Sequence, residues 1–336
     1  MNLLEQQAAN RRRTWLVMAV FVGVLALVGA GVDAFIIGGS TPVPMASLAA
    51  LAIGSGQAWW SLRLGDRSVL ASAAAVPVED RIQAAASEDE RLRYRQFDNI
   101  VEEMAIASGL PKPRAYVIPD NDPNAFATGR DAAHASIAVT EGLLGALNRE
   151  ELQGVVAHEV GHIRNLDIRL MTVVAALVGA VALLADWSGR AARFGGGGSR
   201  RRGRDKNGGA GALLFVVWIV AIMIAPVVAQ LLATAISRRR EYLADATGAE
   251  LTRNPLGLAS ALEKIEGAVD PTMAIKRGTA HLCITDPLGR ALDQREGHWA
   301  DWWATHPPMA KRIAALKAMA YEGGAAAPSS SYTAPR

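Results

Sequence analysis

Hydrophobic residues are unevenly spread along this chain, and four long apolar runs stand out from stretches that mix apolar and charged positions. The first run is uncharged from Thr14 to Val32, which is long enough to cross the hydrocarbon core of a bilayer. A second run follows almost at once, and the short uncharged connection between the two fits a hairpin. We therefore predict an N-terminal membrane anchor in residues 1–70, with two transmembrane helices at about 14–37 and 44–62.

The third and fourth apolar runs lie at residues 170–187 and 211–236. Between them, residues 188–210 are rich in glycine and arginine, a composition typical of a flexible, solvated loop. If both runs span the membrane, this basic loop faces outward, against the positive-inside rule. A hairpin that enters the membrane only partway is the alternative. In both cases the chain returns to the side of the membrane that it left.

Outside the apolar runs, positions with helical and with strand periodicity alternate from residue 79 to residue 322. Short β-branched runs predict strands at residues 114–118, 125–129 and 135–140. Helical spacing predicts helices at residues 79–108, 141–147, 148–164, 237–251, 255–265 and 310–321. We therefore expect one α+β, mostly helical domain, which the apolar hairpin interrupts, and a disordered tail at residues 323–336.

Composition and charge narrow the classes of protein. Hydrophobic residues make up 51% of the chain, which is high for a soluble enzyme, and the net charge is +3. The basic residues gather beside apolar runs, at Arg11–Arg13 and at Arg63 and Arg67, so both outer ends of the anchor are predicted to face the cytoplasm. No basic stripe is interleaved with aromatic residues, so we expect no nucleic-acid partner. The single cysteine, Cys283, excludes a disulfide framework and a cysteine-based zinc cluster, and we expect it to be a small buried residue.

The segment from His158 to His162, with the sequence His-Glu-Val-Gly-His, carries the candidate chemistry. Apolar residues around it recur at helical spacing, and Asn148 with Glu151 predicts a capping box at the start of the helix. Histidines four residues apart lie on one helix face, where two imidazoles can bind one zinc ion. Glu159 can then take a proton from a water molecule that the metal activates. The alternative is a surface helix that carries two histidines and an acid by chance, so the motif needs a third ligand.

Glu241 and Asp245 are the candidates for completing this site. They follow the fourth apolar run, four residues apart, on the side of the membrane to which the hairpin returns. Two histidines and a glutamate form an established hydrolytic zinc site, and Asp245 could accept a hydrogen bond from a ligand imidazole. Alternatively, both acids neutralise Arg238–Arg240 on a solvated helix. The presence of the two histidines favours ligation.

Several motifs follow one another along the chain: Asn124–Gly129, Val139–Leu144, His158–His162 with Asn165 and Asp167, Arg240–Asp245, and Thr305–Pro308. In this order they resemble the HtpX-type membrane zinc metalloproteases, relatives of the CAAX prenyl protease. The resemblance implies a zincin-like catalytic domain on the cytoplasmic face of a multi-pass protein of the bacterial inner membrane. It also implies one zinc ion per chain and an endopeptidase that hydrolyses misfolded or damaged membrane proteins.

The resemblance assigns roles to individual residues. His158, His162 and Glu241 match the zinc ligands, and Glu159 matches the catalytic acid. A segment beside the cleft, predicted to be an edge strand that aligns the substrate backbone, is formed by Asn124, Ala125, Phe126, Ala127, Thr128 and Gly129. His306 is a candidate donor to the oxyanion, although a capping histidine ahead of the last helix fits as well. The long tract at residues 188–210 departs from the family's pattern.

Two other functional classes compete with a protease. A membrane-anchored chaperone or binding protein could use zinc only to hold two helices together, which requires a closed site with a fourth protein ligand. A transporter or channel would have ionisable groups inside its apolar runs, and Asp33 near one end of the first run is too little. We therefore expect protein substrates and a lipid bilayer as the partners of this chain.

Overall fold

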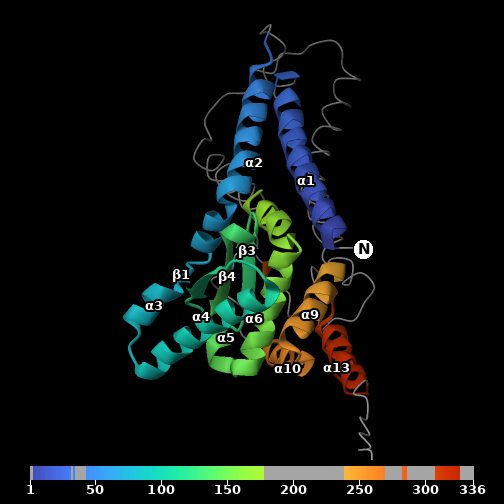
Figure 1. Cartoon of the computed structure of the whole chain (residues 1–336). Helices are drawn as coiled ribbons and strands as arrows, with labels where there is room; N and C mark the ends of the chain where they lie inside the picture. The colour runs from blue at the N-terminus through green and yellow to red at the C-terminus, as the bar shows by residue number, and fades with distance from the viewer. Residues whose placement is uncertain are drawn as a thin grey trace, which may run out of the picture.

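The structure, a computed structural model, describes residues 3–31, 33–34, 43–177, 238–268, 282–285 and 307–325. These residues form a domain of helices around a small sheet, and a pair of long helices rises from one side of it (Figure 1). The glycine- and arginine-rich tract and most of the third and fourth apolar runs lie outside the described residues. Residues 167–177, where the third run begins, are helical.

The sheet has four strands in the order β1-β2-β4-β3: β1 (Val76–Pro77), β2 (Arg114–Ile118), β3 (Ala125–Gly129) and β4 (Ala135–Thr140). The three predicted strands are present with their predicted limits, and β1 is a two-residue addition that pairs with β2. Strand β2 runs parallel to β4, whereas β3 runs antiparallel to β4 and lies at the edge of the sheet. This edge position agrees with the prediction for residues 124–129.

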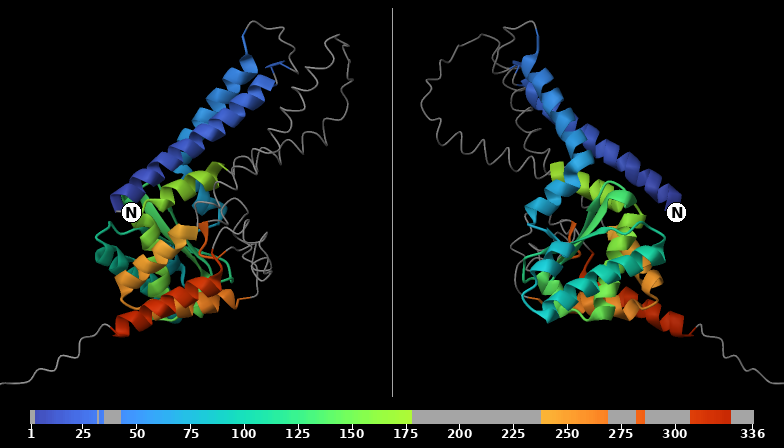
Figure 2. Two further views of the ribbon diagram at one scale, coloured as in Figure 1. Left: turned by 90° about the vertical axis from the view of Figure 1, so that its right-hand side faces the viewer. Right: turned by 60° about the vertical axis from the view of Figure 1, so that its left-hand side comes forward.

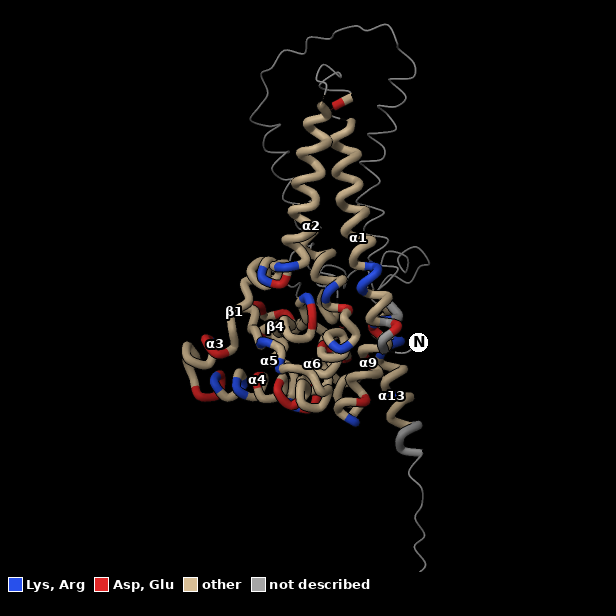
Figure 3. The backbone as a smooth tube through the Cα atoms, turned by 45° about the horizontal axis from the view of Figure 1, so that its top comes forward, with Lys and Arg blue, Asp and Glu red and all other residues tan. Residues whose placement is uncertain are grey.

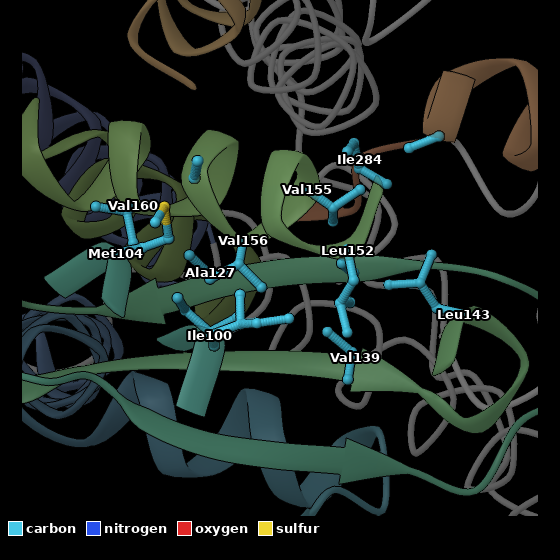
Figure 4. Close-up of a cluster of buried hydrophobic side chains, with 14 of the residues drawn as sticks. Ile100, Met104, Ala127, Val139, Leu143, Leu152, Val155, Val156, Val160 and Ile284 are labelled. Carbon is cyan, nitrogen blue, oxygen red and sulfur yellow. The ribbon is translucent and has the colours of Figure 1, made fainter. Parts of the chain in front are cut away.

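Helices cover both faces of the sheet, so every residue of β3 and β4 is buried. On one face, α4 (Glu88–Ser108) and α6 (Arg149–Arg164) pack Ile100, Met104 and Val156 against Ala127 and Val139 (Figure 4). On the other face, Phe126 and Ala138 contact Met171 and Ala175 of the helical residues 167–177, together with Val69 near the end of α2. The start of the predicted membrane hairpin is thus part of the core.

The predicted single helix at residues 79–108 is wrong, because the chain forms two helices there, α3 (Val78–Ala84) and α4. Ser87 interrupts the helical pattern as the N-cap of α4: its hydroxyl accepts the backbone N–H of Glu90, and the Glu90 carboxylate accepts the N–H of Ala86. This pair satisfies backbone donors at the start of the helix, which favours a new helix over a continuous one. Helix α4 ends at Gly109, as predicted, in the left-handed conformation with φ of 70°.

The other predicted helices are present: α5 (Glu141–Ala146), α9 (Arg238–Thr252), α10 (Pro255–Glu266) and α13 (Met309–Ala325). A short 3-10 helix, η2 (Ala132–His134), precedes β4. Because α13 extends to Ala325, the first three residues of the predicted disordered tail are helical, and the rest of the tail lies outside the described residues. Cys283 is 1% exposed and packs in the core beside the sheet, as expected.

The two helices predicted as the membrane anchor are α1 (Leu3–Gly31) and α2 (Met45–Ser72), which lie side by side in all views (Figures 1 and 2). Both are longer toward the domain than predicted: α1 begins at Leu3, and α2 continues past Leu62 to Ser72. Asp33 joins their far ends, because its carboxylate accepts the backbone N–H groups of Ala46 and Ser47 at the start of α2.

The projecting part of this helix pair carries few charged residues, whereas lysine and arginine lie at its base beside the domain (Figure 3). Large apolar side chains on it are exposed, among them Trp15, Ile53 and Trp59. Within the part of the chain that the structure describes, one helix, Gln7–Gly31, is long and apolar enough to cross a membrane. The second transmembrane helix and the hairpin at 170–236 stay predictions.

Candidate metal centre

Helix α6 carries the His-Glu-Val-Gly-His segment through the middle of the domain. It begins with the predicted capping box: the Asn148 side chain accepts the backbone N–H of Glu151, and the Glu151 carboxylate accepts the backbone N–H of Asn148. Its second half is buried on all sides, and His158, Glu159 and His162 are 0%, 1% and 4% exposed. The alternative of a surface helix with two solvated histidines is therefore wrong.

Helix α9 crosses α6 closely because glycines line the contact. A Cβ atom added at Gly161 would lie 3.2 Å from the Cα of Ala244, and one added at Gly248 would lie 3.1 Å from the backbone nitrogen of His158. Such separations are below ordinary van der Waals contact, so each glycine lets the two backbones approach. This approach brings Glu241, in the first turn of α9, over the two histidines.

The structure brings His158, His162 and Glu241 together, with their ligand atoms all within 4.8 Å of one another. Nε2 of His158 lies 3.7 Å from one Glu241 carboxylate oxygen, and Nε2 of His162 lies 3.6 Å from the other. Zinc bonds of about 2.0–2.2 Å in a tetrahedron separate ligand atoms by about 3.3–3.6 Å. The three side chains are thus spaced to hold one metal ion.

The polar atoms around this point also fit a metal centre. Nε2 of His158 is buried and has no hydrogen-bond partner among the described residues, and both carboxylate oxygens of Glu159 are buried as well. Buried polar atoms of this kind cost free energy, about 1–3 kcal/mol each, unless something binds them. Two imidazole nitrogens and a carboxylate oxygen are a donor set that zinc favours.

Asp245 and Arg312 hold the His158 side of the centre. Nδ1 of His158 lies 2.9 Å from Oδ1 of Asp245. Arg312, from α13, is fully buried and binds the same carboxylate through two bonds, from Nε at 2.9 Å and from a terminal nitrogen at 2.7 Å. Its other terminal nitrogen lies 3.5 Å from Glu241 and donates to the backbone oxygen of Ile284 at 3.1 Å. Asp245 is thus buried in an ion pair with Arg312 and does not lie on a solvated helix face.

Asp167 holds the His162 side. Helix α6 ends at Arg164 with Asn165 as its C-cap, and Leu166 has a φ of 58°, a left-handed conformation that turns the chain sharply before the helical residues 167–177. This turn places Oδ2 of Asp167 3.2 Å from Nδ1 of His162. A carboxylate at this nitrogen fixes the tautomer in which Nε2 is free to bind metal.

The surroundings move the pKa values of these groups in different directions. Burial raises the pKa of Glu159 to about 7, helped by the nearby carboxylate of Glu241 and opposed by His162 and Arg312. Burial also raises the pKa of Asp245, but Arg312 outweighs it and holds that pKa at about 2. Asp245 is therefore an anion at neutral pH, whereas the carboxyl of Glu159 is suited to accepting and releasing a proton.

Strand β3 runs past Glu159. The backbone N–H of Ala127 faces the Glu159 carboxylate and lowers its pKa slightly. The carbonyl of Ala125 points off the same edge and accepts the N–H of Ile284 at 2.9 Å, while the Asn124 amide donates to the carbonyl of Thr285. Residues 282–285 therefore cover the start of the β3 edge, whereas the backbone N–H of Ala127, which faces Glu159, belongs to the middle of that edge.

Not every functional residue was predicted from the sequence. His306 lies outside the described residues, so its role stays a prediction. Arg312 was missed, although a signal exists: it lies on the same face of α13 as the buried residues Met309, Ile313 and Leu316. An arginine among apolar positions at helical spacing indicates a buried ion pair.

Comparison with known proteins now identifies the family. Residues 91–320 match the family model described as "Peptidase family M48". The chain belongs to peptidase family M48. A "Protease HtpX homolog" from Thermoanaerobacter pseudethanolicus is 43% identical over 94% of this chain and 98% of that protein. One from Thermococcus sibiricus is 40% identical over 94% and 97%.

Family M48 membership confirms the resemblance to HtpX-type proteases and the prediction of a metalloprotease. A solved structure, that of S. mikatae Ste24p, matches 93% of this chain and 67% of that chain with a TM-score of 0.47 and 16% identity. An M48 peptidase requires a metal, and the group of two histidines and one glutamate is a site that fits one.

Proposed function

We propose that this M48 peptidase is a zinc-dependent endopeptidase, anchored in the inner membrane by several helices, with its catalytic domain in the cytoplasm. Its substrates are misfolded or damaged membrane proteins. The observation that carries the proposal is the grouping of His158, His162 and Glu241 beside the buried carboxylate of Glu159. The apolar helix Gln7–Gly31 joins the domain directly, which supports the proposal that the substrates lie in or next to the bilayer.

His158, His162 and Glu241 would hold the zinc ion, which when bound activates water and polarises the scissile carbonyl. Glu159 accepts the proton of the attacking water and passes it to the leaving amine, a role for which a pKa of about 7 is suited. The middle of β3 aligns the substrate backbone by adding it as a further strand beside Ala127. His306 is the proposed additional donor to the oxyanion.

A chaperone whose zinc only joins two helices would use a closed site with four protein ligands. The described part of the chain contributes a group of three, the number of protein ligands in a hydrolytic zinc site. The comparisons add no support to this alternative.

The test compares zinc content and proteolysis in the full chain, purified in detergent. Glu159→Gln should keep about one zinc ion per chain, because Glu159 is not a ligand, but lose hydrolysis of casein by about 10²–10⁴-fold. Glu241→Ala should lose both zinc and activity. An unchanged cleavage rate in Glu159→Gln would exclude Glu159 as the base, and full zinc occupancy in Glu241→Ala would exclude Glu241 as a ligand.

A further inference from the structure

The lower end of α1 is packed into the domain on one face only. Arg11, Arg12 and Arg13 are exposed, whereas Asn10 is 5% exposed and Thr14 is fully buried. The buried face lies against the turn that ends α6: Gln7 donates its amide to the carbonyl of Arg164 at 2.8 Å. The candidate membrane helix thus contacts the helix that carries the metal ligands.

Asn10 connects α1 to the metal centre itself. Its side-chain nitrogen donates to Oδ1 of Asp167 at 2.7 Å and to the backbone carbonyl of Asn165 at 3.0 Å, so both amide protons are used. The other oxygen of Asp167 lies 3.2 Å from Nδ1 of His162. A continuous set of buried hydrogen bonds therefore runs from the anchor helix through Asp167 to a metal-binding histidine.

We propose that Asn10 is a positioning residue of the metal centre: by fixing the Asp167 carboxylate, it orients His162, so that the site is complete only when α1 is docked on the domain. This inference rests on the proposed zinc site and extends it to a residue of the membrane anchor.

The chemistry of Asn10 suits this role. Asp167 is 1% exposed, and a buried carboxylate needs short hydrogen bonds to keep one orientation. A terminal nitrogen of Arg240 lies 3.9 Å from Oδ1, beyond hydrogen-bond distance, whereas Asn10 approaches to 2.7 Å. Because the amide is neutral, it fixes the carboxylate without cancelling its charge. Asp167 can then still polarise the imidazole of His162.

On this proposal, a chain binds zinc with full affinity only when α1 is docked on the domain. Gln7 provides a matched comparison, because it bonds to the same turn from the same helix face, but its hydrogen bond goes to the Arg164 carbonyl instead of to Asp167. If the contact between α1 and the domain matters only for packing, loss of either side chain should have the same effect.

The experiment measures the zinc dissociation constant of the metal-stripped full chain in detergent, by competition with a chromophoric chelator. Asn10→Ala should bind zinc about 3–10-fold more weakly, less than the 10–100-fold typical of a direct partner of a ligand. Asn10→Asp, nearly equal in size, should lose at least as much because it places a second carboxylate against Asp167. Gln7→Ala should stay within about twofold of wild type, since it leaves Asp167 bonded.

A double-mutant cycle separates positioning from folding. In an Asp167→Ala background, Asn10→Ala should change zinc affinity no further, because the residue through which it acts is gone. Additive losses, or equal affinities in Asn10→Ala and Gln7→Ala, would overturn the inference. If the wild type binds no zinc, the proposed function fails instead; if it binds zinc and cleaves casein, these outcomes concern Asn10 alone.

Discussion

The two histidines of the metal centre differ in what holds them. Nδ1 of His158 faces Asp245, which the buried Arg312 binds through two hydrogen bonds from the C-terminal helix. Nδ1 of His162 faces Asp167, which accepts a hydrogen bond from the neutral amide of Asn10 on α1, the candidate membrane helix. One side is built from helices of the domain and secured by a buried charge, and the other is secured by the candidate membrane helix α1.

This difference means that folding of the domain should fix one histidine, whereas docking of α1 should fix the other. A buried ion pair is costly to break, so the His158 side should be fixed whenever the domain is folded. The His162 side relies on hydrogen bonds from α1, whose docking contributes much less free energy per contact. The variants below therefore test whether a change affects the His158 side or the His162 side, and whether it alters folding, zinc affinity or substrate binding.

Arg312→Met should have the largest effect on stability. It removes a fully buried cation and leaves Asp245 without its bidentate partner, which costs about 3–5 kcal/mol of unfolding free energy. The melting midpoint in detergent should fall by on the order of 10 °C. Lys317→Met on the same helix is the control: its ion pair with Glu263 is exposed, so its loss should leave the melting midpoint nearly unchanged. Equal shifts in the two variants would mean that the buried pair does not secure the domain.

Arg312 also shows what sequence patterns could and could not predict. The strands, the helix with its capping box and the pair Glu241 and Asp245 follow from local periodicity and spacing, and the structure has them where predicted. The partner of Asp245 lies 67 residues away on another helix, and no local pattern pairs the two. The apolar neighbours of Arg312 on α13 indicate that this arginine is buried, but only the fold shows that it binds Asp245.

The same limit explains Asn10. Its contact with Asp167 joins residues 157 positions apart, and it depends on the left-handed turn at Leu166, which no glycine marks in the sequence. The anchor was predicted from length and hydropathy alone, and those properties say nothing about the polar residue at its base. Likewise, the break between α3 and α4 depends on the N-cap at Ser87, which helical periodicity alone does not reveal.

Asp245→Asn and Asp167→Asn should weaken zinc binding to a similar extent, about 10–100-fold, because each removes the carboxylate that orients one ligand. Their effects on folding should differ. Asp245→Asn leaves Arg312 buried beside a neutral amide, so the metal-free protein should melt clearly below wild type. Asp167→Asn faces the neutral Asn10 and should lower the melting midpoint much less. A metal-free Asp167→Asn protein that melts as low as Asp245→Asn would remove the distinction between the two sides.

Thr172→Val should give the smallest effect, and of a different kind. Its hydroxyl, on the helical residues that begin the third apolar run, accepts the N–H of Gly129 at 3.0 Å and lies 2.8 Å from the hydroxyl of Thr128. Valine keeps the shape but leaves that buried N–H unpaired, at a cost of about 1–2 kcal/mol. The end of β3 should loosen, so KM for a peptide substrate should rise several-fold while zinc affinity stays the same.

Thr247→Val is the control for this change, because its hydroxyl donates to the Leu243 carbonyl of its own helix, and its loss should be nearly neutral. If Thr172→Val weakens zinc binding and leaves KM unchanged, β3 is coupled to the ligands instead of to the substrate. A rise in KM alone would mean that the helical residues 167–177 support both parts of the site, His162 through Asp167 and the substrate strand through Thr172.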